Sequence, residues 1–246
     1  DQKQAHEALV KQAADLARSE TEREHLEFFA YVAAHDLREP LQRIVGFSDL
    51  LRANPKETLT DEGKKYLQKI QDGAYRMSQL IDDLLKFSKV VRRSELFGPV
   101  ALSGVVGDTL EDLDFLIRQS GAKIKVGPLP NIYGDESQLR QLFQNMVSNA
   151  IKFKKENETP NITIESRSAG GAFWEVAIHD EGIGFDPQYS EKVFRPFERL
   201  HTREQYQGSG MGLAICQKIV SHHGGKIFVE THPQEGATFS ILFPKH

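Results

Sequence analysis

Five groups of residues in this chain have types and spacings that suit chemistry, and the first is a histidine beside a carboxylate. His35 is followed by Asp36 in a stretch whose seam positions repeat as 30, 33, 37, 40, 44, 47 and 51. A helix turns by about 100° per residue, so His35 should point away from this seam. An exposed imidazole beside a carboxylate can act as a nucleophile, although most exposed histidines are inert surface.

A polar stripe on a later helix suits a metal-bound phosphate chain. Asn145, Asn149 and Lys152 are spaced i, i+4 and i+7, so they share one helix face. Amide oxygens are hard neutral ligands for Mg²⁺, and a lysine offsets phosphate charge. The alternative is an ordinary solvated helix face.

Asp180-Glu-Gly182-Ile-Gly184 follows a strand in which Trp174, Val176 and Ile178 alternate. Asp180 has the parity of those apolar residues, so its carboxylate should enter the core, where it needs a donor such as the exocyclic amine of adenine. The glycines would let the backbone approach a flat base. The alternative is a tight turn capped by an aspartate.

Gly208, Gly210 and Gly212 precede a helical run, so their N–H groups and the helix dipole could meet phosphates. The spacing is not that of a P-loop. Residues 201–207 before them are polar and unpatterned, the composition of a lid.

The element that carries His35 should be a long helix paired with a second one. Residues 54–63 contain breakers, and a second seam follows at 66, 70, 73, 77, 80, 84 and 87. A single hairpin leaves its seam in water, so we expect two copies to close a four-helix bundle in a homodimer. Upstream, residues 1–28 form either a solvated charged helix or a parallel coiled coil; the continuous register favours the coiled coil.

Beyond an expected linker at Ser88–Pro99, helices and strands mix. We expect helices at Leu102–Gln119 with Ser103 near its cap, at Leu139–Phe153 after a capping box that starts at Asp135, and at Met211–Ser221. The expected strands are Lys123–Val126, Asn161–Arg167, Phe173–His179, Lys226–Thr231 and Ala237–Phe243. The pattern predicts an α/β sandwich.

The composition is that of a soluble globular protein, with 39% hydrophobic and 27% charged residues and a formal net charge of −4. We find no basic stripe for nucleic acid and no apolar run long enough to span a membrane. The single cysteine, Cys216, should pack in the core in a reducing compartment. We expect a cytoplasmic piece of a longer protein, with His222 and His223 at the surface.

The fourth of the five groups is Phe194-Arg-Pro-Phe197, which lies between the Asp180–Gly184 and Gly208–Gly212 segments. The order of the five groups resembles the cytoplasmic core of sensor histidine kinases of two-component systems. The similarity runs from about Phe29 to the C-terminus, and the residues around His35 look like the phytochrome-like and PAS-linked form. It implies a multidomain α and α+β chain: a coiled-coil signalling helix (1–28), a dimerisation and phosphoacceptor hairpin (29–93), and an ATP-binding sandwich of the histidine kinase, gyrase and Hsp90 type (94–246).

By this resemblance His35 accepts the phosphoryl group and Asp36 is its general base. Asn149 would bind Mg²⁺, and Phe194 and Phe197 would anchor the lid. The remaining implied ATP-binding residues are Asn145, Lys152, Asp180, Gly182, Gly184, Arg199, Gly208, Gly210, Gly212 and Thr238.

The resemblance further implies ATP and Mg²⁺ as cofactors, an upstream sensor domain, and transfer of the phosphoryl group to an aspartate in the receiver domain of a response regulator. Glu39 departs from the Thr, Asn or Gln of relatives that also dephosphorylate their partner, which puts phosphatase activity in doubt. Two alternatives stay open: another ATPase of the same nucleotide fold, and a signalling module with an inactive nucleotide site.

Overall fold

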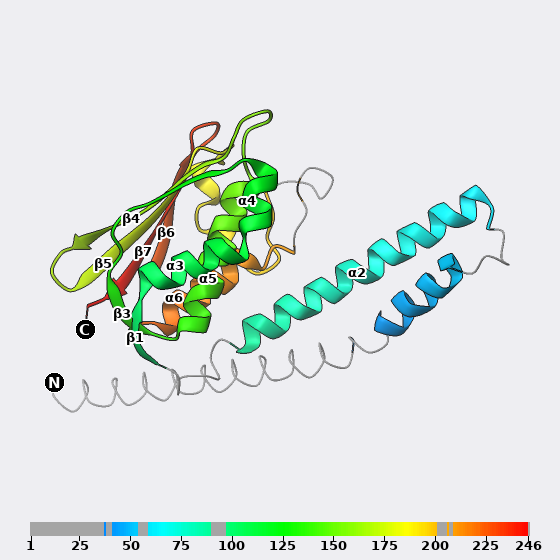
Figure 1. Ribbon diagram of the computed structural model, residues 1–246, viewed down its shortest axis with the longest axis horizontal. Helices are drawn as coiled ribbons and strands as arrows, with labels where there is room; N and C mark the ends of the chain where they lie inside the picture. Colours follow the sequence, from blue (N-terminus) through cyan, green and yellow to red (C-terminus); the bar gives the residue numbers. More distant parts are fainter. Residues whose placement is uncertain are drawn as a thin grey trace, which may run out of the picture. The chain divides into compact units, whose positions relative to one another are not determined.

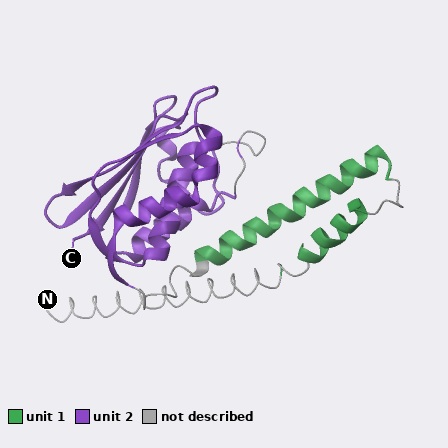
Figure 2. Ribbon diagram, viewed as in Figure 1, with its two compact units in different colours: residues 1–88 green, residues 89–246 purple. Residues whose placement is uncertain are grey.

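The computed structural model describes residues 37, 41–53, 59–89, 97–200, 206 and 209–245. The chain divides into two compact units, Asp1–Ser88 and Lys89–His246 (Figures 1 and 2). His35, Asp36, Gly208 and the expected coiled coil over residues 1–28 lie outside the described residues. Within the described part of the chain, no helix is both long and apolar enough to cross a membrane.

The first unit contains a helical hairpin made of the helix over residues 41–53 and α2 (Asp61–Lys89). The two helices pack through a buried cluster formed by Leu41 on the first helix and Ala74, Ile81 and Leu85 on α2. Across the hairpin, Gln71 Nε2 donates a hydrogen bond of 2.7 Å to Asp49 Oδ1. The hairpin therefore has a narrow apolar core of its own.

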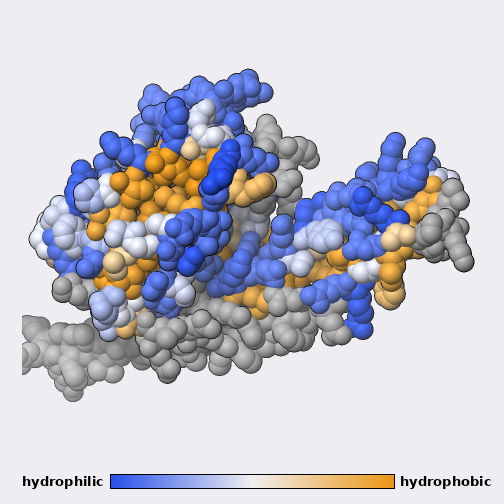
Figure 3. Space-filling model, viewed as in Figure 1, coloured by the Kyte–Doolittle hydropathy of each residue, from blue (hydrophilic) through white to orange (hydrophobic). Residues whose placement is uncertain are grey.

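The stripe that holds the hairpin together is not the predicted seam but its neighbour. On α2 the buried positions 71, 74, 81 and 85 each follow by one residue the seam positions 70, 73, 80 and 84. Several seam side chains remain at the surface, with Phe47 66% exposed and Ile70 52% exposed, whereas Leu84 is partly buried against the cluster. Figure 3 shows hydrophobic residues at the surface of the hairpin. Each helix thus has two adjacent apolar stripes, and the described residues of this chain cover only one of them.

The second unit has helices on one face of a five-stranded sheet (Figure 1). The strand order is β2 (Lys123–Val126), β4 (Asn161–Ala169), β5 (Phe173–Asp180), β7 (Gly236–Pro244) and β6 (Lys226–His232). The β2–β4 pair is parallel and the other pairs are antiparallel. This arrangement confirms the predicted α/β sandwich.

Strand β5 illustrates which side chains enter the core. Val176 and Ile178 are buried, and so are Ile241 and Phe239, their partners on β7. Because side chains alternate along a strand, Asp180 lies on the same face and is only 7% exposed. The predicted burial of this carboxylate is confirmed.

Two helices lie directly against the sheet. Helix α5 (Glu136–Lys152) contacts β4 and β5, and α6 (Gly212–His222) contacts β6, β7 and α5. The predicted cap of α5 is confirmed, because Asp135 Oδ1 accepts from the N–H groups of Ser137 (2.9 Å) and Gln138 (3.2 Å).

The single helix expected over Leu102–Gln119 is wrong. The structure has α3 (Leu102–Asp112) and α4 (Asp114–Ser120), separated at Leu113, and the N-cap is Ala101 rather than Ser103. Leu113 is buried between two exposed aspartates, so the bend brings this side chain into the core.

The expected linker also ends earlier than Pro99. Residues Gly98–Ala101 form β1, which pairs antiparallel with β3 (Asn131–Gly134) in a separate two-stranded sheet. Burial does alternate along β3, but each of the two strands has only four residues. Two short 3₁₀ helices, η3 (Pro187–Tyr189) and η4 (Lys192–Phe194), were not predicted either.

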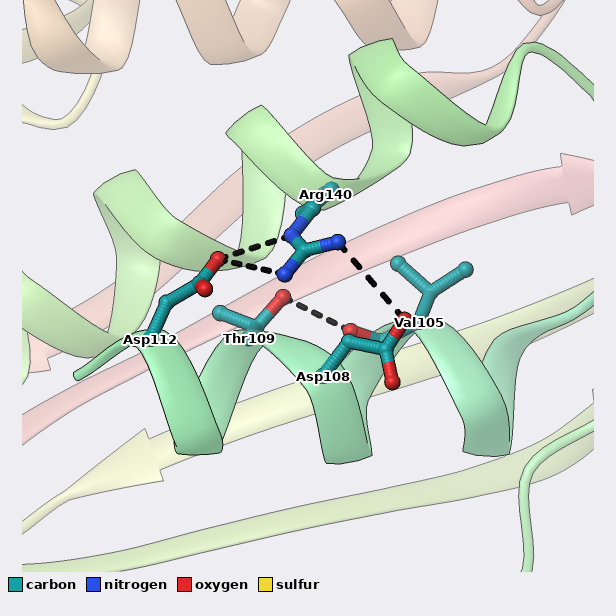
Figure 4. A network of polar contacts seen from close by, with 5 residues as sticks. All are labelled: Val105, Asp108, Thr109, Asp112 and Arg140. Carbon is teal, nitrogen blue, oxygen red and sulfur yellow. Dashed lines mark hydrogen bonds and ion pairs between the residues drawn. The ribbon is translucent and has the colours of Figure 1, made fainter. Parts of the chain in front are cut away.

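A polar network connects α3 to α5 (Figure 4). Arg140 on α5 donates from Nε to Asp112 Oδ2 at 2.7 Å, and its Nη1 lies 3.6 Å from Asp108 Oδ2. The Arg140 hydrogen bond lowers the pKa of Asp112. All three side chains are exposed, so these ion pairs join α3 to α5 but add little stability.

Candidate nucleotide-binding site

The polar stripe of α5 meets the first residue of α6. Asn145 Nδ2 lies 3.4 Å from the carbonyl oxygen of Gly212, to which it donates. A Cβ atom on Gly212 would lie 3.9 Å from both Asn145 Cγ and Asn149 Nδ2. The structure therefore brings Gly212 next to Asn145 and Asn149, which the sequence analysis placed in two separate groups.

Asp180 is a buried carboxylate at the carboxyl end of β5. Burial raises its pKa from the ordinary 3.8 to about 6, while the N–H groups of Gly182 and Ala237 and the charge of His179 act in the opposite direction. The Gly182 N–H donates to Asp180 Oδ1 at 2.9 Å. An acceptor held this way can take a further hydrogen bond from a donor on a ligand.

The glycines after Asp180 are needed for close packing within the protein. A Cβ on Gly182 would collide with the carbonyl oxygen of Phe153, and one on Gly184, which has a positive φ of 54°, would collide with that of His232. Ile183 N–H donates to the Phe153 oxygen at 2.9 Å. These contacts attach the Asp180 loop to the C-terminal end of α5, next to Lys152.

Gly210 and Gly212 shape the start of α6. Gly210 has a φ of 79°, and a Cβ there would lie 2.9 Å from the carbonyl oxygen of Glu198. The N-cap of α6, Met211, makes no side-chain capping bond. The first-turn N–H groups and the positive end of the helix dipole are thus suited to an anion.

Two cationic side chains lie near the C-terminal end of α5. The pKa of Lys152 is lowered, first by burial and then by the charge of Arg199. Arg199 Nη2 donates a hydrogen bond of 2.6 Å to the carbonyl oxygen of Tyr206. Two neighbouring positive charges, one of them half-buried, form a place where a polyanion would be stabilised.

Phe194 and Phe197, predicted as a pair, lie in different environments. Phe194 is buried and its ring meets that of Phe239 edge-on at 6.3 Å. Phe197 is 53% exposed and has a positive φ of 65°, and its N–H donates to Gly210 oxygen at 3.1 Å. Phe194 belongs to the core, whereas the backbone of Phe197 contacts the glycine segment.

Thr238 is not among the residues that the structure brings together. It pairs with His179 across β5 and β7, and His179 Nδ1 lies 2.9 Å from Thr238 Oγ1. Alternation places this pair on the sheet face opposite Asp180, whose partner on β7 is Ala237. The side chain of Thr238 therefore points away from the cluster.

Sequence reasoning missed Phe153 and misplaced His223. The Phe153 ring lies 4.5 Å from Lys152 Nζ and 5.0 Å from the Tyr206 ring, and only its position after Lys152 could have suggested this. His223 is buried, not at the surface as expected, because it packs into the start of α5. The expected burial of Cys216 is confirmed, and burial raises the pKa of its thiol to about 12.

Comparison with known proteins identifies both units. Residues 25–92 match the family model described as His Kinase A (phospho-acceptor) domain. Residues 134–246 match the model described as Histidine kinase-, DNA gyrase B-, and HSP90-like ATPase. The two matches follow each other in the order that the motifs predict.

The chain is 40% identical to the phytochrome-like protein Cph1 of Synechocystis over 238 residues, which cover 97% of this chain and 31% of that protein. It thus spans about three-tenths of the length of this curated relative. Among solved structures, full-length ShkA in complex with AMPPNP has a TM-score of 0.65 and 26% identity, covering 87% of this chain and 45% of ShkA.

Histidine kinase ThkA, solved in complex with response regulator protein TrrA, has a TM-score of 0.59 and 25% identity, covering 89% of this chain and 61% of ThkA. The phosphoacceptor and ATPase family models, the motifs in their order and these relatives agree. The chain belongs to the sensor histidine kinases of two-component systems, and it has phytochrome-like relatives.

Proposed function

We propose that this chain is the core of an ATP-dependent protein histidine kinase that phosphorylates its own His35. The observation that carries the proposal is the cluster at one end of the α5–α6 pair. There the amides of Asn145 and Asn149 adjoin Gly212, and the buried Asp180 loop is attached to α5 beside Lys152. The same unit thus provides a hydrogen-bond acceptor for a base, at Asp180, and a cationic side chain for phosphates, at Lys152. A site for a nucleoside triphosphate requires both.

Each group has a distinct role in holding the nucleotide. Asp180 accepts from the exocyclic amine of adenine, and the first-turn N–H groups of α6, with Lys152 and Arg199, contact the phosphates. Asn149 is the ligand for Mg²⁺ and Asn145 its neighbour, because an amide oxygen suits this hard cation. Bound Mg²⁺ would neutralise phosphate charge during transfer.

The chemistry is an in-line phosphoryl transfer. An imidazole nitrogen of His35 attacks the γ-phosphorus, the bond to the bridging oxygen breaks, and ADP leaves with the electron pair. Asp36 accepts the imidazole proton. The phosphoryl group then passes to an aspartate of a response regulator, a partner supported by the complex of ThkA with TrrA.

We also propose a homodimer formed through the hairpin. The seam side chains that a single chain leaves exposed, such as Phe47 and Ile70, form part of a second stripe on both helices. A second hairpin would bury this stripe in a four-helix bundle. The same proposal includes an upstream sensor domain, a cytoplasmic location, and domain limits at residues 1–28, 29–93 and 94–246.

Incubation of the chain with radiolabelled ATP and magnesium tests the function. We expect a label on the protein that is stable to base and labile to acid, and that is absent from His35→Gln although this variant still binds ATP. Release of free phosphate without labelled protein would support a hydrolytic ATPase instead. Failure to bind ATP would support a signalling module with an inactive site.

A further inference from the structure

A cluster of aromatic and polar residues lies at the end of α6 that is remote from Gly212. The Phe97 ring lies 5.1 Å from that of His222, edge-on, and 4.7 Å from that of His223. Both histidines belong to the C-terminal end of α6, whose 11 residues separate them from Gly212 by ~16 Å. None of these residues has a role in holding the nucleotide.

His223 uses both of its ring nitrogens in the cluster. Its Nε2 accepts from the Asp135 N–H at 3.0 Å, so its Nδ1 carries the proton and donates to the Ile219 oxygen at 2.8 Å. A Cβ on Gly134 would lie 2.6 Å from the His223 ring. The glycine at the junction of β3 and α5 therefore leaves the space that this imidazole occupies.

Gln138 completes the connection between the two helices. Its Nε2 donates to Asp135 Oδ2 at 3.2 Å, and its Oε1 accepts from His222 Nδ1 at 3.0 Å. Asp135, Gln138 and His223 are all buried. One end of the α5–α6 pair is thus held by this network, while the other end carries Asn145, Asn149 and Gly212.

Phe97 joins this network to the incoming chain. It is half-buried and directly precedes β1, whose first residue, Gly98, pairs with Gly134 on β3. The chain that arrives from the phosphoacceptor hairpin is therefore attached to the helix pair at Phe97, through ring contacts with His222 and His223.

We infer that Phe97 is a positioning residue for phosphoryl transfer to His35. By packing on His222 and His223, it fixes the start of the ATP-binding unit to the α5–α6 pair, and the delivery of the nucleotide to the histidine depends on this attachment. A small misorientation of reacting groups slows a transfer strongly even when binding is intact. The inference rests on the proposed kinase function.

The test separates binding from transfer. Phe97→Ala should bind a non-hydrolysable ATP analogue within about twofold of the parent in calorimetry, while the rate of His35 labelling at saturating ATP falls about tenfold or more. Phe97→Tyr, which keeps the ring, should restore most of the rate. The matched control is Phe115→Ala, because Phe115 on α4 is 78% exposed and should change neither quantity.

An unchanged labelling rate in Phe97→Ala would overturn the inference. So would a parallel loss of affinity and rate, since that indicates a purely structural role. If the parent itself acquires no label, the proposed kinase function fails and this inference fails with it. If the parent is labelled, the inference is decided by the labelling rate of Phe97→Ala divided by that of the parent.

Discussion

At the scale of single residues, Asp180 carries its charge where burial disfavours it. A rise in pKa from 3.8 to about 6 means that folding favours the protonated over the ionised form by ~3 kcal/mol relative to an aspartate in water. The folded state therefore loses stability as the pH rises through this interval. A donor from the base would stabilise the ionised carboxylate, so the same residue that costs stability in the free protein favours the bound nucleotide.

We predict that nucleotide affinity falls as the pH drops through about 6, because the protonated carboxyl is a poorer acceptor. Asp180→Asn should bind about tenfold more weakly at pH 8 and should lose this pH dependence, with no decrease in melting temperature. Calorimetric titrations at pH 8 and pH 5.5 measure both effects. Unchanged affinity in Asp180→Asn would refute the role of the carboxylate.

Glu175 provides the control for this prediction. It lies on the same strand, is buried to a similar degree and is on the opposite face, where bonds from Arg167 lower its pKa. Glu175→Gln should reduce stability, because it breaks the bidentate pair with Arg167, yet leave nucleotide affinity as in the parent.

At the scale of elements, the pair α5 and α6 connects the nucleotide site to the start of the domain. Its remote end depends on a neutral His223, because protonation of Nε2 would set two N–H groups against each other. Burial lowers the pKa of His223, as does the charge of His222, while Asp135 acts against both. Neutral His223 thus contributes stability that is complete above the ordinary histidine pKa of 6.5.

We predict that the contribution of His223 to the stability of the ATP-binding unit decreases as the pH falls below about 6.5, because the unfolded chain then binds a proton that folded His223 resists. His223→Gln should melt at a lower temperature than the parent at pH 8, and this difference in melting temperature should narrow as the pH falls. Melting curves between pH 8 and pH 5 give the comparison. His232→Gln is the control, since His232 is exposed, and a slope like that of His223→Gln would contradict the assignment.

At the scale of the whole molecule, the described part of the hairpin exposes more large hydrophobic side chains than it buries. The covered and uncovered stripes differ by one position in the sequence, so the same heptad pattern serves both an internal and an external contact. Association of two chains would remove the exposed stripe from water, and burial of apolar area would drive it.

We predict that Ile70→Glu shifts the chain from dimer to monomer, because it places a charge in the seam. Light scattering after size-exclusion chromatography over a range of concentrations measures the change. Tyr75→Glu is the matched control: Tyr75 is 50% exposed against 52% for Ile70, but it lies midway between seam positions 73 and 77, on the opposite side of α2. A monomeric parent, or equal effects of both changes, would exclude the seam as the interface.

Local periodicity was sufficient for much of this protein. Alternation along β5 predicted the burial of Asp180, the Asp135 cap marked the start of α5, and the order of the motifs identified the family before any contact was known. The burial of Asp180 and the Asp135 cap depend on neighbours within a few residues, and such relations are the same in any fold that contains the element.

Only the tertiary structure decided which elements meet. It placed Gly212 beside Asn145 and Asn149, buried His223 against Asp135, and turned Thr238 to the far face of the sheet. It also selected, in the hairpin, the stripe one residue beyond the predicted seam. The spacing of apolar residues within one helix or strand reveals its apolar face. Which element packs against that face depends on contacts between residues far apart in the chain.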